Sequence, residues 1–235
     1  MKAALDHIHP ETSGITTFWF QPEKPVRYTA GQFIELTLKH ENPDDRGGKR
    51  WFTLSSAPGH DLVSITTRYA GDDRSSSFKK ALFGMQPGAE LVMSEPMGDF
   101  VLPKDAVTPL IFVAGGIGLT PFHSMFLHLA ETHEQRDIRF LYSVHSEDDI
   151  IFQDAFEAAG IHATIVVENP SGSWGGERGR ITPEMILGLT EPSSESLVYV
   201  SGPEPMIEAL AQGLHVAGIP KRRLVTDYFP GYTAL

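Results

Sequence analysis

The chain has 235 residues, 41% of them hydrophobic, which is enough for one large domain or two ordinary ones with real cores. Its 30 Asp and Glu against 19 Lys and Arg give a formal net charge of -11, which disfavours a nucleic-acid partner. The sequence contains no cysteine, which excludes disulfides, thiolate zinc sites, cysteine-ligated iron-sulfur clusters and a cysteine nucleophile, so redox chemistry needs a bound organic cofactor.

The first half of the chain has the pattern of short strands. Its first thirty residues lack the apolar core of a signal peptide, and no later run approaches the roughly twenty residues of a membrane span, so we expect a cytoplasmic chain without membrane insertion. In QFIELTLKH, residues 32–40, apolar and polar side chains alternate as in a strand with one buried face. Similar runs occur at 52–56, 62–69 and 89–96, joined by turn formers. We therefore predict a small antiparallel barrel or sandwich over residues 1–104.

From residue 105 the pattern changes to strands that alternate with helices. Apolar runs typical of strands with two buried faces occur at 109–116, 138–144, 163–169, 196–202 and 223–229. Their spacing leaves room for crossover helices, which predicts a doubly wound α/β sheet of five parallel strands over residues 105–235.

Two of these crossover helices are visible in the sequence. The first has Thr120 as its expected N-cap and Pro121 as its first residue. Its apolar residues share one helical face: Phe122, Met125, Phe126 and Leu129. The second repeats this pattern with Met206, Leu210 and Leu214, and we expect it to end at Gly218.

Two strand ends carry the strongest local signals. In FVAGGIGLTP, residues 112–121, a buried strand runs into glycines and a helix start, a pattern that suits a pyrophosphate because glycines permit close backbone approach and the helix start offers free N-H groups. A tight strand-helix turn explains it equally well, since the third glycine of the usual fingerprint is missing. The stretch SGPEPM places Ser201 and Gly202 at the same carboxyl edge of the sheet, where Ser201 serves either as a helix cap or as a ligand contact.

The ordered set of RWFTLSS in a β-domain with GGIGLTP, SGPEPM and DYF in an α/β domain resembles the ferredoxin-NADP reductase superfamily of two-domain flavoprotein reductases. The resemblance covers essentially the whole chain. It implies an FAD-binding β-barrel domain, residues 1–104, and an NAD(P)H-binding α/β domain, residues 105–235. The implied activity is hydride transfer from NADH or NADPH to bound FAD, followed by electron transfer to a ferredoxin-like or other one-electron acceptor.

The resemblance also implies a flavin site. In the family's Arg-x-Tyr-Ser motif the arginine pairs with the pyrophosphate, the aromatic ring packs on the isoalloxazine and the hydroxyl bonds flavin N5; these positions are Arg50, Phe52 and Thr53. Phe52 lacks the phenol hydroxyl of the family's tyrosine. The remaining candidates for flavin contact are Trp51, Arg68 and Tyr69.

The serine-rich turn RSSSFKKAL resembles the second phosphate-binding turn of the family, with Ser76 and Ser77 as the candidates. Without the family, a serine run before a helix is simply an N-cap. Both interpretations stay open on the sequence.

The resemblance to this superfamily also implies a nicotinamide-nucleotide site, formed by the glycine turn and the SGP edge. The residues implied are Gly115, Gly116, Gly118, Thr120, Pro121, Gly202, Pro203 and Met206. Ser201 replaces the cysteine that faces the nicotinamide in the family, and Asp227 is expected near the nicotinamide. Phe229 is expected to cover the second flavin face, with core packing as its other interpretation. The candidate catalytic residues are therefore Thr53, Ser201, Asp227 and Phe229.

The end of the second α/β strand bears on the choice of nicotinamide nucleotide. The stretch YSVHSEDDIIF, residues 142–152, has three acids where an NADPH site needs a cation, which favours NADH. The cations that folding could bring to this strand end are Arg178, Arg180 and His145.

Two other functions stay open on the sequence. The first is an NAD(P)H:flavin reductase that releases its flavin, and the second is an electron-transfer subunit of a larger redox complex. The ten histidines are scattered and predict no metal site.

Overall fold

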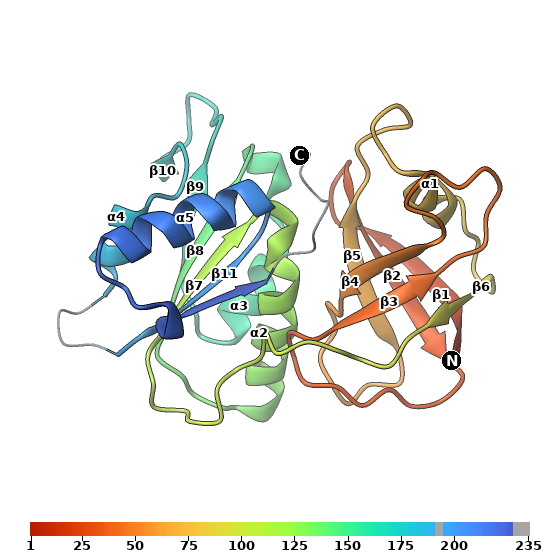
Figure 1. The fold of residues 1–235 in the computed structure, drawn as a ribbon, viewed down its shortest axis with the longest axis horizontal. Coiled ribbons are helices and arrows are strands. Elements are labelled where there is room, and N and C mark those ends of the chain that lie inside the picture. The colour runs from red at the N-terminus through yellow and green to blue at the C-terminus, as the bar shows by residue number, and fades with distance from the viewer. Residues whose placement is uncertain (191–194, 228–235) are drawn as a thin grey trace. The chain divides into compact units, whose positions relative to one another are not determined.

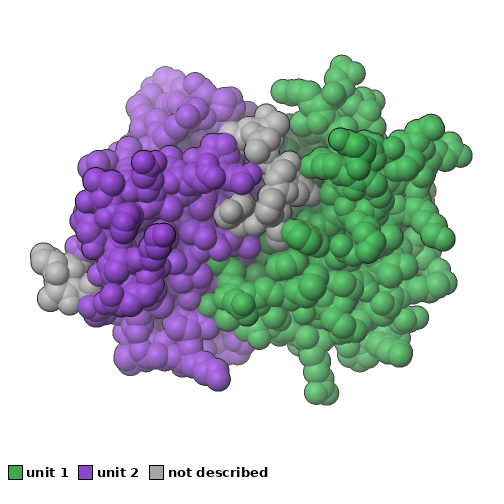
Figure 2. Space-filling view, in the orientation of Figure 1, with its two compact units in different colours: residues 1–101 green, residues 102–235 purple. Residues whose placement is uncertain are grey.

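The computed structural model describes residues 1–190 and 195–227 and divides the chain into two compact units, Met1–Val101 and Leu102–Leu235, coloured separately in Figure 2. The boundary predicted after residue 104 lies close to this division and stays a prediction. Among the described helices, none is both long and apolar enough to cross a membrane.

Unit 1 is a six-stranded antiparallel sheet with the strand order β4-β3-β6-β1-β2-β5 (Figure 1). Its strands are β1 (Lys2–Pro10), β2 (Ile15–Pro22), β3 (Phe33–Thr37), β4 (Lys49–Thr53), β5 (Val63–Arg68) and β6 (Glu90–Met93). The two end strands of this order meet through a bridge between Leu54 and Ile65, and the Ser55 N-H donates to the Ser64 carbonyl at 2.8 Å. The sheet therefore closes on itself, and the predicted antiparallel barrel is confirmed.

The register of β3 and β4 decides which side chains of the RWFT stretch face inward. Ile34 lies opposite Phe52, and Leu36 lies opposite Arg50. Because Ile34 and Leu36 are fully buried in the barrel core, Arg50 and Phe52 also point to the buried face, while Trp51 between them is 43% exposed. Helix α1 (Ser77–Phe83) contributes Phe78 and Leu82 to the same core.

A chain of buried hydroxyl groups links β2, β5 and the residues that follow β4. Ser55 Oγ lies 2.9 Å from Ser64 Oγ and accepts from Thr66 Oγ1 at 2.9 Å. Thr66 Oγ1 in turn lies 2.8 Å from Thr17 Oγ1, which donates to Glu11 at 2.6 Å. The hydroxyl that follows RWFTL in the sequence is thus satisfied inside the barrel and has a structural role.

Unit 2 is a sheet with the strand order β10-β9-β8-β7-β11-β12, and all its neighbouring pairs are parallel. Its strands are β7 (Leu110–Gly115), β8 (Ile138–Val144), β9 (Ala163–Val167), β10 (Glu177–Arg178), β11 (Leu197–Ser201) and β12 (Leu224–Asp227). The predicted parallel α/β sheet is confirmed, but the described residues form six strands rather than five. The sixth, β10, consists of two exposed charged residues, so no apolar run marks it in the sequence.

Helices cover both faces of this sheet. They are α2 (Thr120–Thr132), α3 (Gln153–Ala158), α4 (Pro183–Gly188) and α5 (Glu204–Val216). Ile111 and Val113 of β7 share a core with α4 and α5, which crosses in front of the sheet in Figure 1. Phe112, on the opposite face of β7, packs on Phe122 of α2 at 4.6 Å. The predicted apolar face of α2 is buried in full, which confirms the doubly wound arrangement.

The start of α2 differs from the prediction. A short 3-10 helix, Gly116–Leu119, runs directly into α2, so Leu119 already has helical backbone angles and occupies the N-cap position. Thr120 is the first helical residue, and its hydroxyl donates to the Ile117 carbonyl at 3.1 Å. The prediction of Thr120 as N-cap was wrong because helical geometry begins before it.

Candidate functional site

The two glycine-containing turns predicted from the sequence lie side by side in unit 2. Strands β7 and β11 are parallel neighbours, and Ala114 lies opposite Ser201. The turn that follows each strand therefore emerges at the same carboxyl edge of the sheet, where open α/β folds bind ligands.

Close backbone approach explains the glycines of this edge. A Cβ atom on Gly118 would lie 2.5 Å from the backbone nitrogen of Gly202 and would also overlap the Ser201 carbonyl. A Cβ on Gly115 would lie 2.5 Å from the sulfur of Met206 on α5. Gly116 has a φ of +52°, and a Cβ there would meet nothing within 4 Å. The turn is thus packed against its neighbour at Gly115 and Gly118 and open at Gly116.

The remaining predicted residues of this edge belong to the two helix starts. Thr120 and Pro121 are buried in the first turn of α2. Pro203 is the N-cap residue of α5, and no side chain caps that helix. The interpretation of Ser201 as a helix cap was therefore wrong, because the helix begins beyond its reach.

Ser201 instead faces the last described strand. It lies opposite Asp227 on β12, and its hydroxyl donates to the Asp227 carboxylate. Burial raises the pKa of Asp227 to about 6, and the hydrogen bond from Ser201 limits that rise. Two of the predicted catalytic residues thus form one hydrogen-bonded pair. Phe229 lies outside the described residues.

A second cluster lies where β8 and β9 end. The Glu168 N-H donates to the Val144 carbonyl at 2.9 Å, which places Glu168 beside the end of β8. Its carboxylate accepts from Arg180 Nε at 2.7 Å and lies 3.4 Å from His145 Nδ1. The hydrogen bond from Arg180 lowers the pKa of Glu168. Arg180 and His145 do reach this region, but both face a carboxylate, while Arg178 donates to the Trp174 carbonyl at 2.6 Å.

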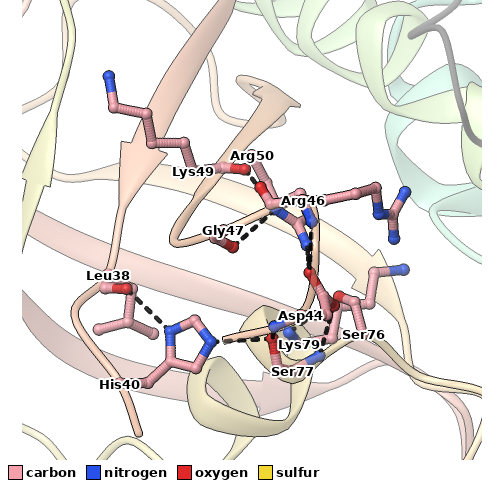
Figure 3. Close-up of polar contacts among 10 residues, drawn as sticks. All are labelled: Leu38, His40, Asp44, Arg46, Gly47, Lys49, Arg50, Ser76, Ser77 and Lys79. Atoms are coloured by element: carbon pink, nitrogen blue, oxygen red, sulfur yellow. Dashed lines mark hydrogen bonds and ion pairs between the residues drawn. The ribbon is translucent and has the colours of Figure 1, made fainter. Parts of the chain in front are cut away.

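In unit 1, Arg50 is held by the loop between β3 and β4 (Figure 3). Its Nη1 donates to the carbonyls of Arg46 at 2.8 Å, Gly47 at 2.9 Å and Lys49 at 2.6 Å. Its Nη2 donates to Asp44 Oδ1 at 2.9 Å. The Nε of Arg50 is buried and has no hydrogen-bond partner within the described part of the chain. The side chain is only 4% exposed, so this orphaned donor marks a place for a further acceptor.

Asp44 joins Arg50 to the predicted serine turn. Its Oδ2 accepts from the Ser77 N-H at 3.0 Å, and Ser77 Oγ accepts from the Asp44 N-H at 2.8 Å (Figure 3). Burial alone would raise the pKa of Asp44, but the bonds from Ser77 and Arg50 outweigh it and lower that pKa. Ser77 Oγ also lies 2.9 Å from Nε2 of His40, whose Nδ1 lies 3.0 Å from the Leu38 carbonyl. Because a carbonyl only accepts, Nδ1 carries a proton.

Ser76 is the N-cap of α1, and its Oγ accepts from the Lys79 N-H at 3.3 Å. The N-cap interpretation of this serine is therefore confirmed. A phosphate contact by Ser76 or Ser77 stays a prediction.

Lys79 is a feature that sequence reasoning missed. Its Nζ donates to the Arg68 carbonyl at 2.9 Å. Burial and the positive charges of Arg46, Arg68 and Arg50 lower the pKa of Lys79 to about 8. We call Arg46, Arg50, Arg68 and Lys79 the cationic cluster. Its four members are spread over 34 positions of the sequence, so no local pattern in the sequence reveals the cluster before the fold is known.

Two further predicted flavin residues, Phe52 and Thr53, are consecutive in β4. The Thr53 side chain is buried, and no hydrogen bond to another described residue occupies its hydroxyl. Phe52 is also buried, with its ring 5.8 Å from that of Phe78.

Trp51 lies 5.9 Å from Phe33 between ring centroids. Tyr69 stacks on Phe83 at 4.6 Å, and its hydroxyl donates to Asp72. Both aromatic side chains thus already have partners of their own in unit 1. In the part of the chain that the structure describes, no three His, Asp or Glu side chains gather closely enough to hold a metal ion.

Comparison with known proteins gives matches across the chain. The family described as oxidoreductase NAD-binding domain matches residues 112–212. The reductase component of propane 2-monooxygenase from Rhodococcus jostii is 26% identical over 242 residues, covering 97% of this chain and 63% of that protein. The NADH oxidoreductase HCR of Escherichia coli is 29% identical over 221 residues, covering 94% of this chain and 66% of that protein. The chain thus spans just under two thirds of the length of each relative.

Solved structures share the fold of the whole chain. The flavohem-like FAD/NAD-binding domain of nitric oxide dioxygenase from Vibrio cholerae has a TM-score of 0.83 at 19% identity, with 97% of this chain and 98% of that one covered. A ferredoxin NADP+ reductase from Neisseria gonorrhoeae has a TM-score of 0.78 at 19% identity, with 97% of both chains covered. The β-barrel and the parallel α/β sheet thus have the fold of these two solved structures, and residues 112–212 match the oxidoreductase NAD-binding domain family.

Proposed function

We propose that this chain is an NADH-dependent flavoprotein reductase that holds FAD on unit 1, binds NADH on unit 2 and passes electrons to a one-electron protein acceptor. The observation that carries the proposal is the cationic cluster. In a chain of net charge -11, three arginines lie close enough to Lys79 to lower its pKa. Asp44 pairs with Arg50, and a dinucleotide pyrophosphate would supply two further negative charges to the remaining cations.

The residues of unit 1 fit a flavin nucleotide. The buried Nε of Arg50 supplies an unused donor beside the cluster. The Thr53 hydroxyl, which forms no hydrogen bond to another described residue, supplies a group for flavin N5. Ser77 contacts Asp44, which also binds Arg50, and Ser76 contacts the backbone of Lys79. We propose that their hydroxyl groups add donors for the phosphates.

The residues of unit 2 fit a nicotinamide dinucleotide. The open space at Gly116 and the 13-residue helix α2 that follows supply backbone N-H groups for a pyrophosphate. The match of residues 112–212 to an NAD-binding domain supports this assignment. The packed glycines, Gly115 and Gly118, keep side chains out of the turn.

Bound FAD would supply an acceptor for the nicotinamide hydride and a donor of single electrons to a protein acceptor. The task of the protein is then to position the two groups, because near-contact geometry supplies much of the rate. Ser201 and Asp227 act as one unit: the carboxylate holds the Ser201 hydroxyl in a single orientation and so defines where the nicotinamide amide can bind. We also propose that Phe229 covers a flavin face.

The preference for NADH follows from Glu168. Its carboxylate neutralises Arg180 and faces His145, the two cations that could otherwise attract a 2'-phosphate at this strand end. A phosphate there would be repelled by the Glu168 charge, whereas a ribose hydroxyl could donate to it.

The acceptor is proposed from the relatives. Propane 2-monooxygenase reductase component is by its name one part of an oxygenase system. We infer that this chain likewise serves a protein acceptor, either an oxygenase component or a ferredoxin-like carrier.

A second candidate function is an NAD(P)H:flavin reductase that releases its flavin. Phe52 favours it, because a phenylalanine ring offers no hydroxyl to hold the ribityl chain. Desalting the protein after incubation with FAD separates the two functions. A yellow protein with one FAD per chain supports the retained cofactor, whereas complete loss of colour with continued NADH-dependent reduction of added flavin supports the released one.

A further inference from the structure

We infer that Lys79, a residue outside the motifs that suggested the flavin site, contacts the flavin pyrophosphate directly and takes up a proton when the nucleotide binds. This inference rests on the proposed FAD site and adds a binding residue and a pH dependence to it.

The position of Lys79 carries the first step. Helix α1 starts at Ser77, and its first turn is tied to Ser76 and, through Asp44, to Arg50. Lys79 Nζ donates to the carbonyl of Arg68 at the end of β5, which fixes the ammonium group between α1 and β5. Lys80, the next residue, is exposed and lies in the last turn of the same helix. Only one of the two adjacent lysines is therefore directed into the cationic cluster.

The charges around Lys79 come from each neighbouring segment. The loop between β3 and β4 contributes Arg46 and Asp44, and β4 contributes Arg50. Strand β5 contributes Arg68, and His40 contacts the α1 start through Ser77 Oγ. The Asp44 carboxylate accepts hydrogen bonds from Arg50 and from the Ser77 N-H. Its negative charge is therefore compensated by these groups rather than by Lys79.

These surroundings disfavour the ammonium form in the empty protein. Burial and the three arginines lower the pKa of Lys79 to about 8. A pyrophosphate beside Nζ acts in the opposite direction, because an adjacent negative charge stabilises the ammonium and raises that pKa. Between these two pKa values the bound state holds one more proton than the free state, and the buffer supplies that proton.

The sign of the pH dependence follows. Below pH about 7 the amine is already charged, so binding takes up little or no proton through Lys79. Above pH about 8 each binding event must first protonate the amine, so FAD affinity falls with rising pH, approaching about tenfold per pH unit. A lysine that only anchors α1 to the Arg68 carbonyl would give no such slope.

The test is calorimetric titration of FAD into flavin-free protein at pH 6.5 and pH 8.5, in two buffers with different ionisation enthalpies. We expect wild type to take up between about 0.5 and 0.8 proton per FAD at pH 8.5 and close to none at pH 6.5. K80M, the matched control, should behave like wild type. K79M should lose the uptake and bind FAD about tenfold more weakly at pH 7, the loss of one charge-assisted hydrogen bond.

K79R separates a charge contact from packing. Arginine stays protonated throughout this range, so K79R should bind FAD at pH 8.5 without proton uptake. Wild-type binding with no uptake at pH 8.5, or the same uptake in K79M as in wild type, overturns the inference while leaving the FAD site intact. Failure of wild type to bind FAD at either pH overturns the proposed function together with the inference.

Discussion

Ser201 donates a hydrogen bond from its hydroxyl to the carboxylate of Asp227, the residue opposite it on the neighbouring parallel strand. Burial raises the pKa of Asp227 from 3.8 to about 6 despite this bond. Between these two values the folded state binds more protons than the unfolded state, so the free energy of unfolding falls as pH rises through this window. Burial of the ionised Asp227 carboxylate therefore lowers stability at neutral pH, and the bond from Ser201 reduces that cost.

Replacement of Asp227 by Asn tests this relationship. The amide keeps the shape but carries no charge, so we expect D227N to be more stable than wild type at pH 8 by about 1–2 kcal/mol, with the difference shrinking as pH falls below 6. Denaturant unfolding at pH 4.5 and pH 8 measures it. D137N, at an exposed aspartate, is the control. A stability difference that does not change with pH would contradict the burial of an ionised Asp227.

Lys79 is expected to lower the stability of the flavin-free protein. Its folded pKa of about 8 is below the ordinary 10.5, so wild-type stability rises with pH between these values. At pH 7 the free energy of unfolding of K79M should therefore exceed that of wild type by about 1–3 kcal/mol, because an apolar side chain replaces a partly buried charge. Thermal unfolding should show this as a higher melting temperature. The gap should narrow by pH 9, and K80M should show no such gap. Destabilisation by K79M at pH 7 would refute this account of the cluster.

Gly118 is expected to tolerate no side chain. Its Cβ would lie 2.5 Å from the Gly202 backbone nitrogen, so G118A must push the two turns apart. We expect a loss of about 1–3 kcal/mol in stability, the usual cost of overpacking, together with weaker NADH binding. G172A is the matched control, because a Cβ there meets nothing within 4 Å. Thermal unfolding and NADH titration report the two effects, and equal behaviour of the two variants would show that the turns are not packed together.

Glu168 is expected to set the preference between the nicotinamide nucleotides. In E168Q the carboxylate that pairs with Arg180 becomes neutral, which leaves the guanidinium and His145 available to a 2'-phosphate. We expect the ratio of kcat/KM for NADPH over NADH to rise at least about tenfold, or about 1.4 kcal/mol. E177Q, at an exposed glutamate of β10, should leave the ratio unchanged. Titration with 2',5'-ADP and 5'-AMP gives the same comparison without turnover; no change in either ratio would count against Glu168.

The sequence predicts the fold of both units where periodicity is regular. The five apolar runs of the second half and the face of α2 are visible because each repeats a simple period. In the first half, β1 and β2 are not among the predicted runs; in β1 the register shifts between Leu5 and His7, which breaks the alternation of buried and exposed residues. The prediction of Thr120 as a cap failed because a 3-10 helix precedes it, and one-dimensional cap rules do not include such a turn.

The candidate sites were predictable where residues are contiguous in the chain. The glycine turn and the SGP edge are each local, and parallel pairing of β7 and β11 brings them together. The bonds between Asp44 and Ser77 join residues 33 positions apart, and no local pattern announces them. The same holds for the effect of Arg46 on Lys79. Charge clusters of this kind depend on which loop folds over which helix, so they become visible only in three dimensions.

The measurement that tests the central claim most directly is the visible absorbance of the protein, incubated with FAD and desalted, during anaerobic titration with NADH and, separately, NADPH. We predict one flavin per chain, bleached by about one equivalent of NADH and bleached more slowly by NADPH. A protein that holds no flavin, or whose flavin keeps its colour with both nucleotides, would contradict the proposed reductase.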